Sequence, residues 1–158
     1  MKDRLFDEIR TENTSAVEAI LHNSPILVSE KDARGSTPLL LATYYGFYGI
    51  SEIILKYPQN IDAQDASGNT ALMGVCFKGF ENIAKLLLDN GANPNITNFN
   101  GATALIFAVT FGRKEIAKLL LENGADSTIK DDRGNTALTH AKLQGIKEMV
   151  ELLEAEKK

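Results

Sequence analysis

The chain has 158 residues, and its 17 basic and 21 acidic side chains give a formal net charge of −4. Hydrophobic residues make up 44% of it and charged residues 24%, values that are ordinary for a folded domain and that exclude the disordered class. No apolar run approaches the ~18 residues of a membrane span, and the acidic balance argues against nucleic acid as a partner.

A period of 33 residues organises the chain from residue 32 onward. Six columns of residues keep this step through four successive units, which chance does not do. The most regular columns are Gly35, Gly68, Gly101 and Gly134; Thr37, Thr70, Thr103 and Thr136; Leu39, Leu72, Leu105 and Leu138; and Gly46, Gly79, Gly112 and Gly145. The period predicts one repeat domain over 1–158, with internal repeats 32–64, 65–97 and 98–130 and a C-terminal capping repeat 131–158.

Residues 1–31 are expected to form a degenerate N-terminal capping repeat. The span from Leu5 to Leu21 has the length of the corresponding span in the next unit, and apolar residues fall at its core positions, but the turn glycines are missing. Ser15 and Glu18 have the spacing of a capping box, which predicts that a second helix begins at Ser15.

The unit 32–64 predicts a turn, a short helix, a second turn and a second helix. Asp32 to Gly35 has the composition of a tight turn, Thr37 can cap a helix that starts at Pro38, and Gly46 suits the left-handed position after the helix. Apolar residues then recur at helical spacing until Tyr57-Pro58. Two short helices need stacked neighbours to bury their apolar sides, so the units are expected to form a solenoid.

These units resemble the ankyrin repeat. The likeness is carried by Asp65-Ala66-Ser67-Gly68-Asn69-Thr70-Ala71-Leu72 and by Leu119-Leu120-Leu121-Glu122-Asn123-Gly124-Ala125-Asp126. It implies an all-α repeat protein, an ankyrin-type α-solenoid of stacked helix-turn-helix units joined by hairpin-like loops. The family's histidine after Thr-Pro-Leu is absent here, so apolar packing is expected to replace its hydrogen bonds between repeats. The residues at that position are Leu40, Met73, Ile106 and Thr139.

No constellation for catalysis is evident, so we expect no enzyme, no cofactor and no metal site. His140 is expected to pack in the last repeat, His22 to be solvated, and Cys76 to be a small buried residue. A single cysteine also forms no internal disulfide, and with no secretion signal evident the expected location is cytoplasmic.

The resemblance implies that the turn tips and the residues before the Gly46 column line a concave surface. Five of the eleven aromatic residues fall at these positions, where polar residues are usual. Aromatic and arginine side chains dominate the energy of protein interfaces, so this surface is the candidate binding site. The candidate residues are Tyr44, Tyr45, Phe77, Lys78, Phe99 and Phe111, with Arg34 and Arg133 as rim charges.

The leading hypothesis is a non-catalytic protein–protein interaction module whose concave face and turn tips bind a partner protein, as regulator, inhibitor or adaptor. Two alternatives stay open: a small-ligand binder or enzyme with a shallow pocket between repeats, and a structural scaffold that self-assembles. Polar replacements in the last repeat, Thr139 and Glu154, favour a monomer over open-ended assembly.

Overall fold

The computed structural model describes residues 1–156, so the last two positions of the expected repeat 131–158 lie outside the described residues. Within the described part the chain is all-α and contains no strand, which confirms the expected repeat solenoid. The elements, in chain order, are α1 (Lys2–Arg10), α2 (Thr14–Asn23), the 3-10 helix η1 (Pro25–Ser29), α3 (Pro38–Tyr44), α4 (Tyr48–Leu55), α5 (Ala71–Lys78), α6 (Glu81–Asp89), α7 (Ala104–Thr110), α8 (Lys114–Glu122), α9 (Ala137–Gln144) and α10 (Lys147–Glu156).

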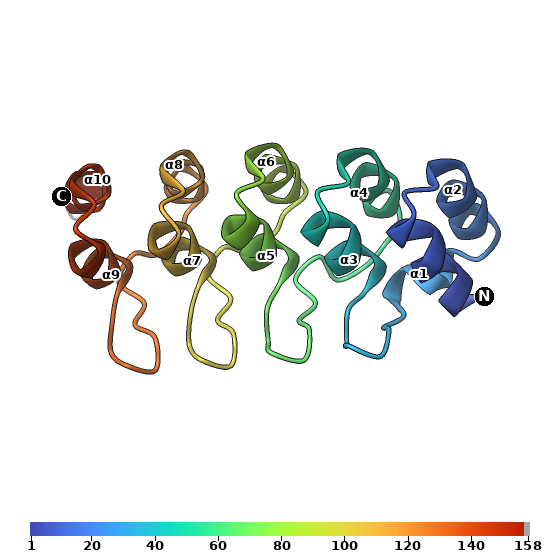
Figure 1. The fold of residues 1–158 in the computed structure, drawn as a ribbon, viewed down its shortest axis with the longest axis horizontal. Coiled ribbons are helices and arrows are strands. Elements are labelled where there is room, and N and C mark those ends of the chain that lie inside the picture. Colours follow the sequence, from blue (N-terminus) through green and yellow to red (C-terminus); the bar gives the residue numbers. More distant parts are fainter. Residues whose placement is uncertain (157–158) are drawn as a thin grey trace.

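The helices form two parallel rows along an elongated molecule (Figure 1). The inner row is α1, α3, α5, α7 and α9, and each of these helices packs against its neighbours in the row. The outer row consists of α2, α4, α6, α8 and α10, each paired with the inner helix that precedes it. Hairpin loops precede α3, α5, α7 and α9 and project from the inner row on the side away from the outer row (Figure 1). The stack therefore presents one surface made of hairpins and inner helices.

Each inner helix from α3 onward begins at its threonine, as the sequence predicts. Thr37 Oγ1 accepts a hydrogen bond of 3.2 Å from the N–H of Leu40, and Pro38 occupies the first helical position. Thr70, Thr103 and Thr136 cap α5, α7 and α9 in the same way. These bonds satisfy N–H groups that have no partner inside the helix.

Each hairpin is held by the side chain of the aspartate or asparagine at its first position. Asp32 Oδ1 accepts backbone hydrogen bonds from Arg34 at 2.9 Å and Ser36 at 3.0 Å. Asp65 and Asp131 repeat this pattern, and Asn98 does so with its side-chain oxygen. One oxygen of each side chain is thereby committed to the turn, and the second atom, Oδ2 or Nδ2, remains for other contacts.

The predicted capping box of the N-terminal repeat is wrong. Helix α2 begins at Thr14, and its N-cap is Asn13, whose side-chain oxygen accepts a hydrogen bond of 3.2 Å from the N–H of Ala16. The side-chain amide of Asn13 also donates to Glu8 at 2.8 Å, which holds the cap in place. Asparagine is as good an N-cap as serine, and here it precedes Ser15 in the chain and already satisfies the first turn.

One hydrophobic core runs through all the repeats and includes the residues at the family's histidine position. Leu40, Met73 and Ile106 are buried, so apolar packing does take that place in the first three of these repeats. Hydrogen bonds between repeats persist in the hairpins instead, where Gln64 Nε2 donates to the carbonyl of Thr97 at 3.0 Å and Asn98 Nδ2 to Asn69 Oδ1 at 2.9 Å. Adjacent repeats are thus joined by a core and by a polar ladder.

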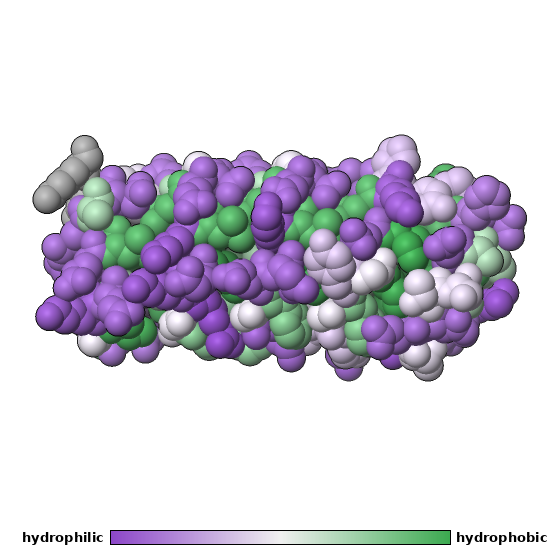
Figure 2. Space-filling view, turned by 90° about the horizontal axis from the view of Figure 1, so that it is seen from above, coloured by the Kyte–Doolittle hydropathy of each residue, from purple (hydrophilic) through white to green (hydrophobic). Residues whose placement is uncertain are grey.

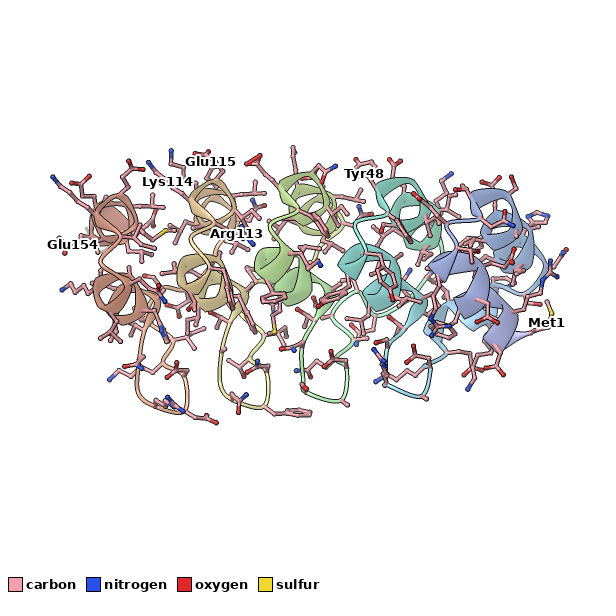
Figure 3. The ribbon with its side chains drawn as sticks, in the orientation of Figure 1. Met1, Tyr48, Arg113, Lys114, Glu115 and Glu154 are labelled. Atoms are coloured by element: carbon pink, nitrogen blue, oxygen red, sulfur yellow. The ribbon has the colours of Figure 1, made fainter. Side chains whose placement is uncertain are left out.

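The last repeat carries its polar replacements at accessible places. Glu154 is exposed on α10 at one end of the stack (Figure 3), and Thr139 is half-buried with its hydroxyl 3.1 Å from that of Thr136.

Viewed from the side of the outer helices, the surface is mainly hydrophilic, with hydrophobic side chains visible between the repeats (Figure 2). None of the helices in residues 1–156 combines the length and the apolar character needed to cross a membrane.

Candidate protein-binding surface

The aromatic residues singled out from the sequence are all exposed. Tyr44, Tyr45, Phe77 and Phe111 stand at the C-terminal ends of the inner helices with 38–48% of their surface accessible. Phe99 is 68% exposed on the hairpin before α7. Exposure of this many rings on hairpins and inner helices is unusual, because large apolar side chains gain ~1.5–3 kcal/mol from burial.

Four of these rings form a row across three repeats. Phe77 and Phe111 meet edge to face with ring centroids 4.8 Å apart, and Phe111 stacks on Phe107 at 6.3 Å. Tyr44 and Tyr45 are 6.3 Å apart in the repeat before them. Lys78 joins the two groups, since its Nζ lies 5.0 Å from the centre of the Tyr44 ring. We call Tyr44, Tyr45, Phe77, Lys78 and Phe111 the aromatic row.

The turn-tip residues lie apart from the aromatic row. The ring of Phe99 covers Gly68 of the preceding hairpin, and its N–H donates to the carbonyl of Ser67 at 3.2 Å. Arg34 and Arg133 are exposed on the first and last hairpins, and neither forms an ion pair within residues 1–156. The candidate residues therefore divide into a helix-end group and a hairpin group on the same side of the molecule.

Leu143 is an exposed apolar residue that is not among the candidates predicted from the sequence. This side chain on α9 is 73% exposed and occupies the same repeat position as Tyr44 and Phe77. Its position in that column was a sufficient signal, but a leucine on a helix is more often a core residue than an exposed one. It extends the apolar surface into the last repeat.

A groove of about 590 Å³ runs between the first two hairpins and helices α3 and α5. Tyr44, Tyr45 and Phe77 line it from the helix ends, and Asp32, Arg34, Asp65 and Asn69 line it from the hairpins. Gly74 also lines the groove, and a Cβ at this position would meet only the Tyr44 ring, at 3.6 Å. The corresponding residues of the other repeats, which carry side chains, are Leu41, Phe107 and His140.

The two carboxylates of the groove have different partners. Asp32 Oδ2 is 3.3 Å from Arg10 Nη2, so its charge is neutralised by a side chain of α1. Asp65 is half-buried, its Oδ1 accepts the two backbone bonds of its turn, and its Oδ2 has no hydrogen-bond or ion-pair partner within the described residues. Arg34 lies on the same groove but forms no ion pair with Asp65.

The side chains with catalytic potential, Cys76 and His22, lie on different helices and form no common site. Cys76 is fully buried in α5, and burial raises the pKa of its thiol, so the unreactive neutral form dominates. His22 is exposed, as expected. No group of three or more metal-ligating side chains comes together in residues 1–156.

His140 does more than pack in the last repeat. It is half-buried on α9, and its Nε2 donates a hydrogen bond of 2.7 Å to Asp131 Oδ2 of the hairpin. Burial alone would raise the pKa of Asp131, but this bond and the backbone N–H groups of Asn135 and Arg133 outweigh it, so the pKa is lowered. The pair ties the hairpin to its own inner helix.

Arg113 adds a fixed contact beneath the aromatic row. It reaches from the turn between α7 and α8 toward the preceding repeat (Figure 3), where its Nη2 donates a hydrogen bond of 2.9 Å to the carbonyl of Phe77. Its Nε is buried without a partner among the described residues. The guanidinium lies over Gly79, the left-handed C-cap of α5, and so immobilises the end of that helix.

The sequence matches a family model that describes three consecutive ankyrin repeats. The model matches three overlapping segments, residues 5–98, 52–131 and 97–158, which together span almost the whole chain. No curated protein gives a significant match to the chain. Ankyrin repeats generally serve as protein–protein interaction modules and are typically non-catalytic. Its repeat period, its paired helices and this match together establish that the chain belongs to the ankyrin repeat family.

Proposed function

We propose that this protein is a non-catalytic interaction module that binds a partner protein through its inner helix ends and hairpin tips. The observation that carries the proposal is the aromatic row, which exposes four rings along three successive repeats. An exposed apolar surface of this kind is typical of a partner site, and aromatic residues supply the anchors of most interfaces.

The surface is preorganised, which favours affinity. Phe77 is held by the ring of Phe111, and its carbonyl is held by Arg113. The neighbouring hairpins are bonded to each other through side chains and backbone. A partner would therefore order few groups on this side of the interface, and each side chain that need not be immobilised saves ~0.5–1.5 kcal/mol.

In this proposal Tyr44, Phe77 and Phe111 are the central anchors, Tyr45 and Phe99 extend the contact, and Arg34, Lys78 and Arg133 supply charges at the edge. The protein acts as a cytoplasmic monomer that regulates, inhibits or connects its partner. The exposed Glu154 at one end of the stack supports the monomer, because a charged residue there opposes stacking of a second copy.

The test combines Tyr44→Ala, Phe77→Ala and Phe111→Ala in one variant and compares it with wild type in affinity capture from the source cells, followed by identification of the retained proteins. Tyr48→Ala is the control, because Tyr48 is an exposed aromatic residue on the outer helix α4 (Figure 3). We expect the partner to be retained by wild type and by the control and to be lost from the triple variant.

Thermal unfolding separates binding from folding. Loss of three half-exposed rings is expected to cost ~2–4 kcal/mol and to lower the melting temperature by roughly 5–15 °C, at ~2–4 °C per kcal/mol for a chain of this size, while unfolding stays cooperative. A triple variant that is folded and retains the same proteins as wild type would refute the proposal.

A further inference from the structure

The first position of each hairpin is an aspartate or asparagine, and one of these side chains has an oxygen without a protein partner among the described residues. The four residues are Asp32, Asp65, Asn98 and Asp131, and each of them uses one side-chain oxygen to hold its turn. The remaining atom of three of them is also bonded. Asp32 Oδ2 meets Arg10, Asn98 Nδ2 donates to Asn69, and Asp131 Oδ2 accepts from His140. Asp65 Oδ2 is the exception within residues 1–156.

The last repeat contains a hydrogen-bond donor that the second internal repeat, residues 65–97, lacks. His140 and Gly74 occupy the same position in their repeats, as do Asp131 and Asp65. His140 Nε2 donates to Asp131 Oδ2 at 2.7 Å, whereas a glycine at 74 leaves the space in front of Asp65 as part of the groove. The second repeat therefore has the acceptor of this pair without the donor.

Aromatic rings stand around that space. Tyr44, Tyr45 and Phe77 line the same groove as Asp65, and Tyr44 borders the empty position directly, because a Cβ at residue 74 would lie 3.6 Å from its Cδ1. Rings beside a carboxylate form a favourable site for a cation. The Tyr44 ring already interacts with one cation of this chain, the Nζ of Lys78.

We propose that the groove at Gly74 binds an arginine side chain of the partner protein. The guanidinium would donate to Asp65 Oδ2 from the place that His140 takes in the last repeat and would stack on the surrounding rings. Arginine suits the groove because its planar guanidinium is weakly hydrated and combines stacking with directed hydrogen bonds. The inference rests on the proposed function and specifies the chemistry of the partner.

The other charges of the groove are compatible with this ligand. Arg10 is paired with Asp32. Arg34 is an exposed residue of the hairpin, where water and salt screen its charge. Asp65 is half-buried and has no ion-pair partner within residues 1–156, so its charge remains available to a ligand in the groove.

The test uses Nα-acetyl-arginine N-methylamide as the probe, titrated into isotope-labelled protein and followed by NMR chemical shifts. The corresponding citrulline derivative, which has almost the same shape but no charge, is the matched control. We expect saturable shifts at Tyr44, Gly74 and Phe77 with the arginine probe and at least fivefold weaker binding of citrulline.

Two variants locate the site. Asp65→Asn should weaken the arginine probe at least fivefold, and it should fold because Asn98 makes the same two turn bonds in its repeat. Gly74→His should abolish binding, because its imidazole can take the place that His140 shows in the last repeat. Asp89→Asn removes the same charge from the outer helix α6 and should leave binding unchanged.

Arg34→Gln tests whether the groove prefers a positively or a negatively charged ligand. If the ligand is basic, removal of the Arg34 charge strengthens binding of the arginine probe. The corresponding glutamate derivative is the acidic control. Equal binding of arginine and citrulline, stronger binding of the glutamate derivative, or unchanged binding by Asp65→Asn would overturn the inference. The proposed function would stand in each case if the Tyr44, Phe77 and Phe111 variant still failed to capture the partner.

Discussion

Arg113 Nη2 donates a hydrogen bond of 2.9 Å to the carbonyl oxygen of Phe77, across the boundary between two repeats. The equivalent residues of the two preceding repeats are Phe47 and Phe80. The ring of Phe80 covers Gly46 as the guanidinium of Arg113 covers Gly79. One position thus uses an aromatic ring in one repeat and a cation in the next to cover the glycine of the preceding unit.

We predict that Arg113→Ala lowers the free energy of unfolding by ~1.5–3 kcal/mol, the value of a hydrogen bond made by a charged donor. Arg113→Phe also loses the hydrogen bond but keeps a side chain over Gly79, as Phe80 covers Gly46, so it should lose less than Arg113→Ala. Urea unfolding of both variants measures the difference. Equal losses for the two would mean that the hydrogen bond alone matters.

Gly74→Ala should stabilise the protein. Gly74 lies inside α5, where glycine is ~0.5–1 kcal/mol less favourable than alanine, and an added Cβ makes only an ordinary contact with Tyr44 at 3.6 Å. We expect the free energy of unfolding to rise by about that amount, as measured by urea unfolding. A decrease would show that the Tyr44 ring cannot tolerate the methyl group.

Two glycines of the hairpin column separate backbone strain from steric crowding. Gly68 and Gly134 both have a positive φ, +81° and +79°, but a Cβ on Gly68 would come within 2.7 Å of the Phe99 backbone nitrogen, whereas the surroundings of Gly134 are open. Gly134→Ala should cost only the ~1–2 kcal/mol of a left-handed alanine.

Gly68→Ala should cost clearly more than Gly134→Ala, because the next hairpin must also move. Urea unfolding of the two variants under the same conditions makes the comparison. Losses of the same size would indicate that the hairpin of Phe99 shifts without cost.

The pair of Asp131 and His140 predicts acid sensitivity in the last repeat. Because the pKa of Asp131 is lowered from its ordinary 3.8, its contribution to stability is complete above that value and is lost as the pH falls through the lower folded value. In Asp131→Asn this part of the acid dependence should disappear.

Urea unfolding of wild type and Asp131→Asn between neutral pH and about pH 3 tests the prediction, since the difference between the two curves should shrink toward the acid end. Asn98 shows that asparagine holds the same turn, so the variant retains its hairpin. Curves that stay parallel over the whole range would argue against the pair.

The repeat and its helices were readable from the amino-acid sequence because their causes are local. A threonine followed by an apolar run starts each inner helix from α3 onward, an aspartate or asparagine with a glycine three residues later makes each hairpin, and the period places both. The same reasoning located the exposed aromatic residues, because their columns have no packing role. It failed at Asn13, where two good caps compete within three residues.

The groove and its charges depend on residues that meet only when the repeats are stacked. That Asp32 is neutralised by Arg10, Asp131 is paired with His140 and Asp65 is left without a donor follows from the distances between hairpins and helices, not from any spacing along the chain. Arg113 belongs to the same class, since an arginine at the start of a helix does not reveal whether it will reach the preceding repeat. Short-range signals set the shape of each unit, and contacts between units set which side chains remain available to a partner.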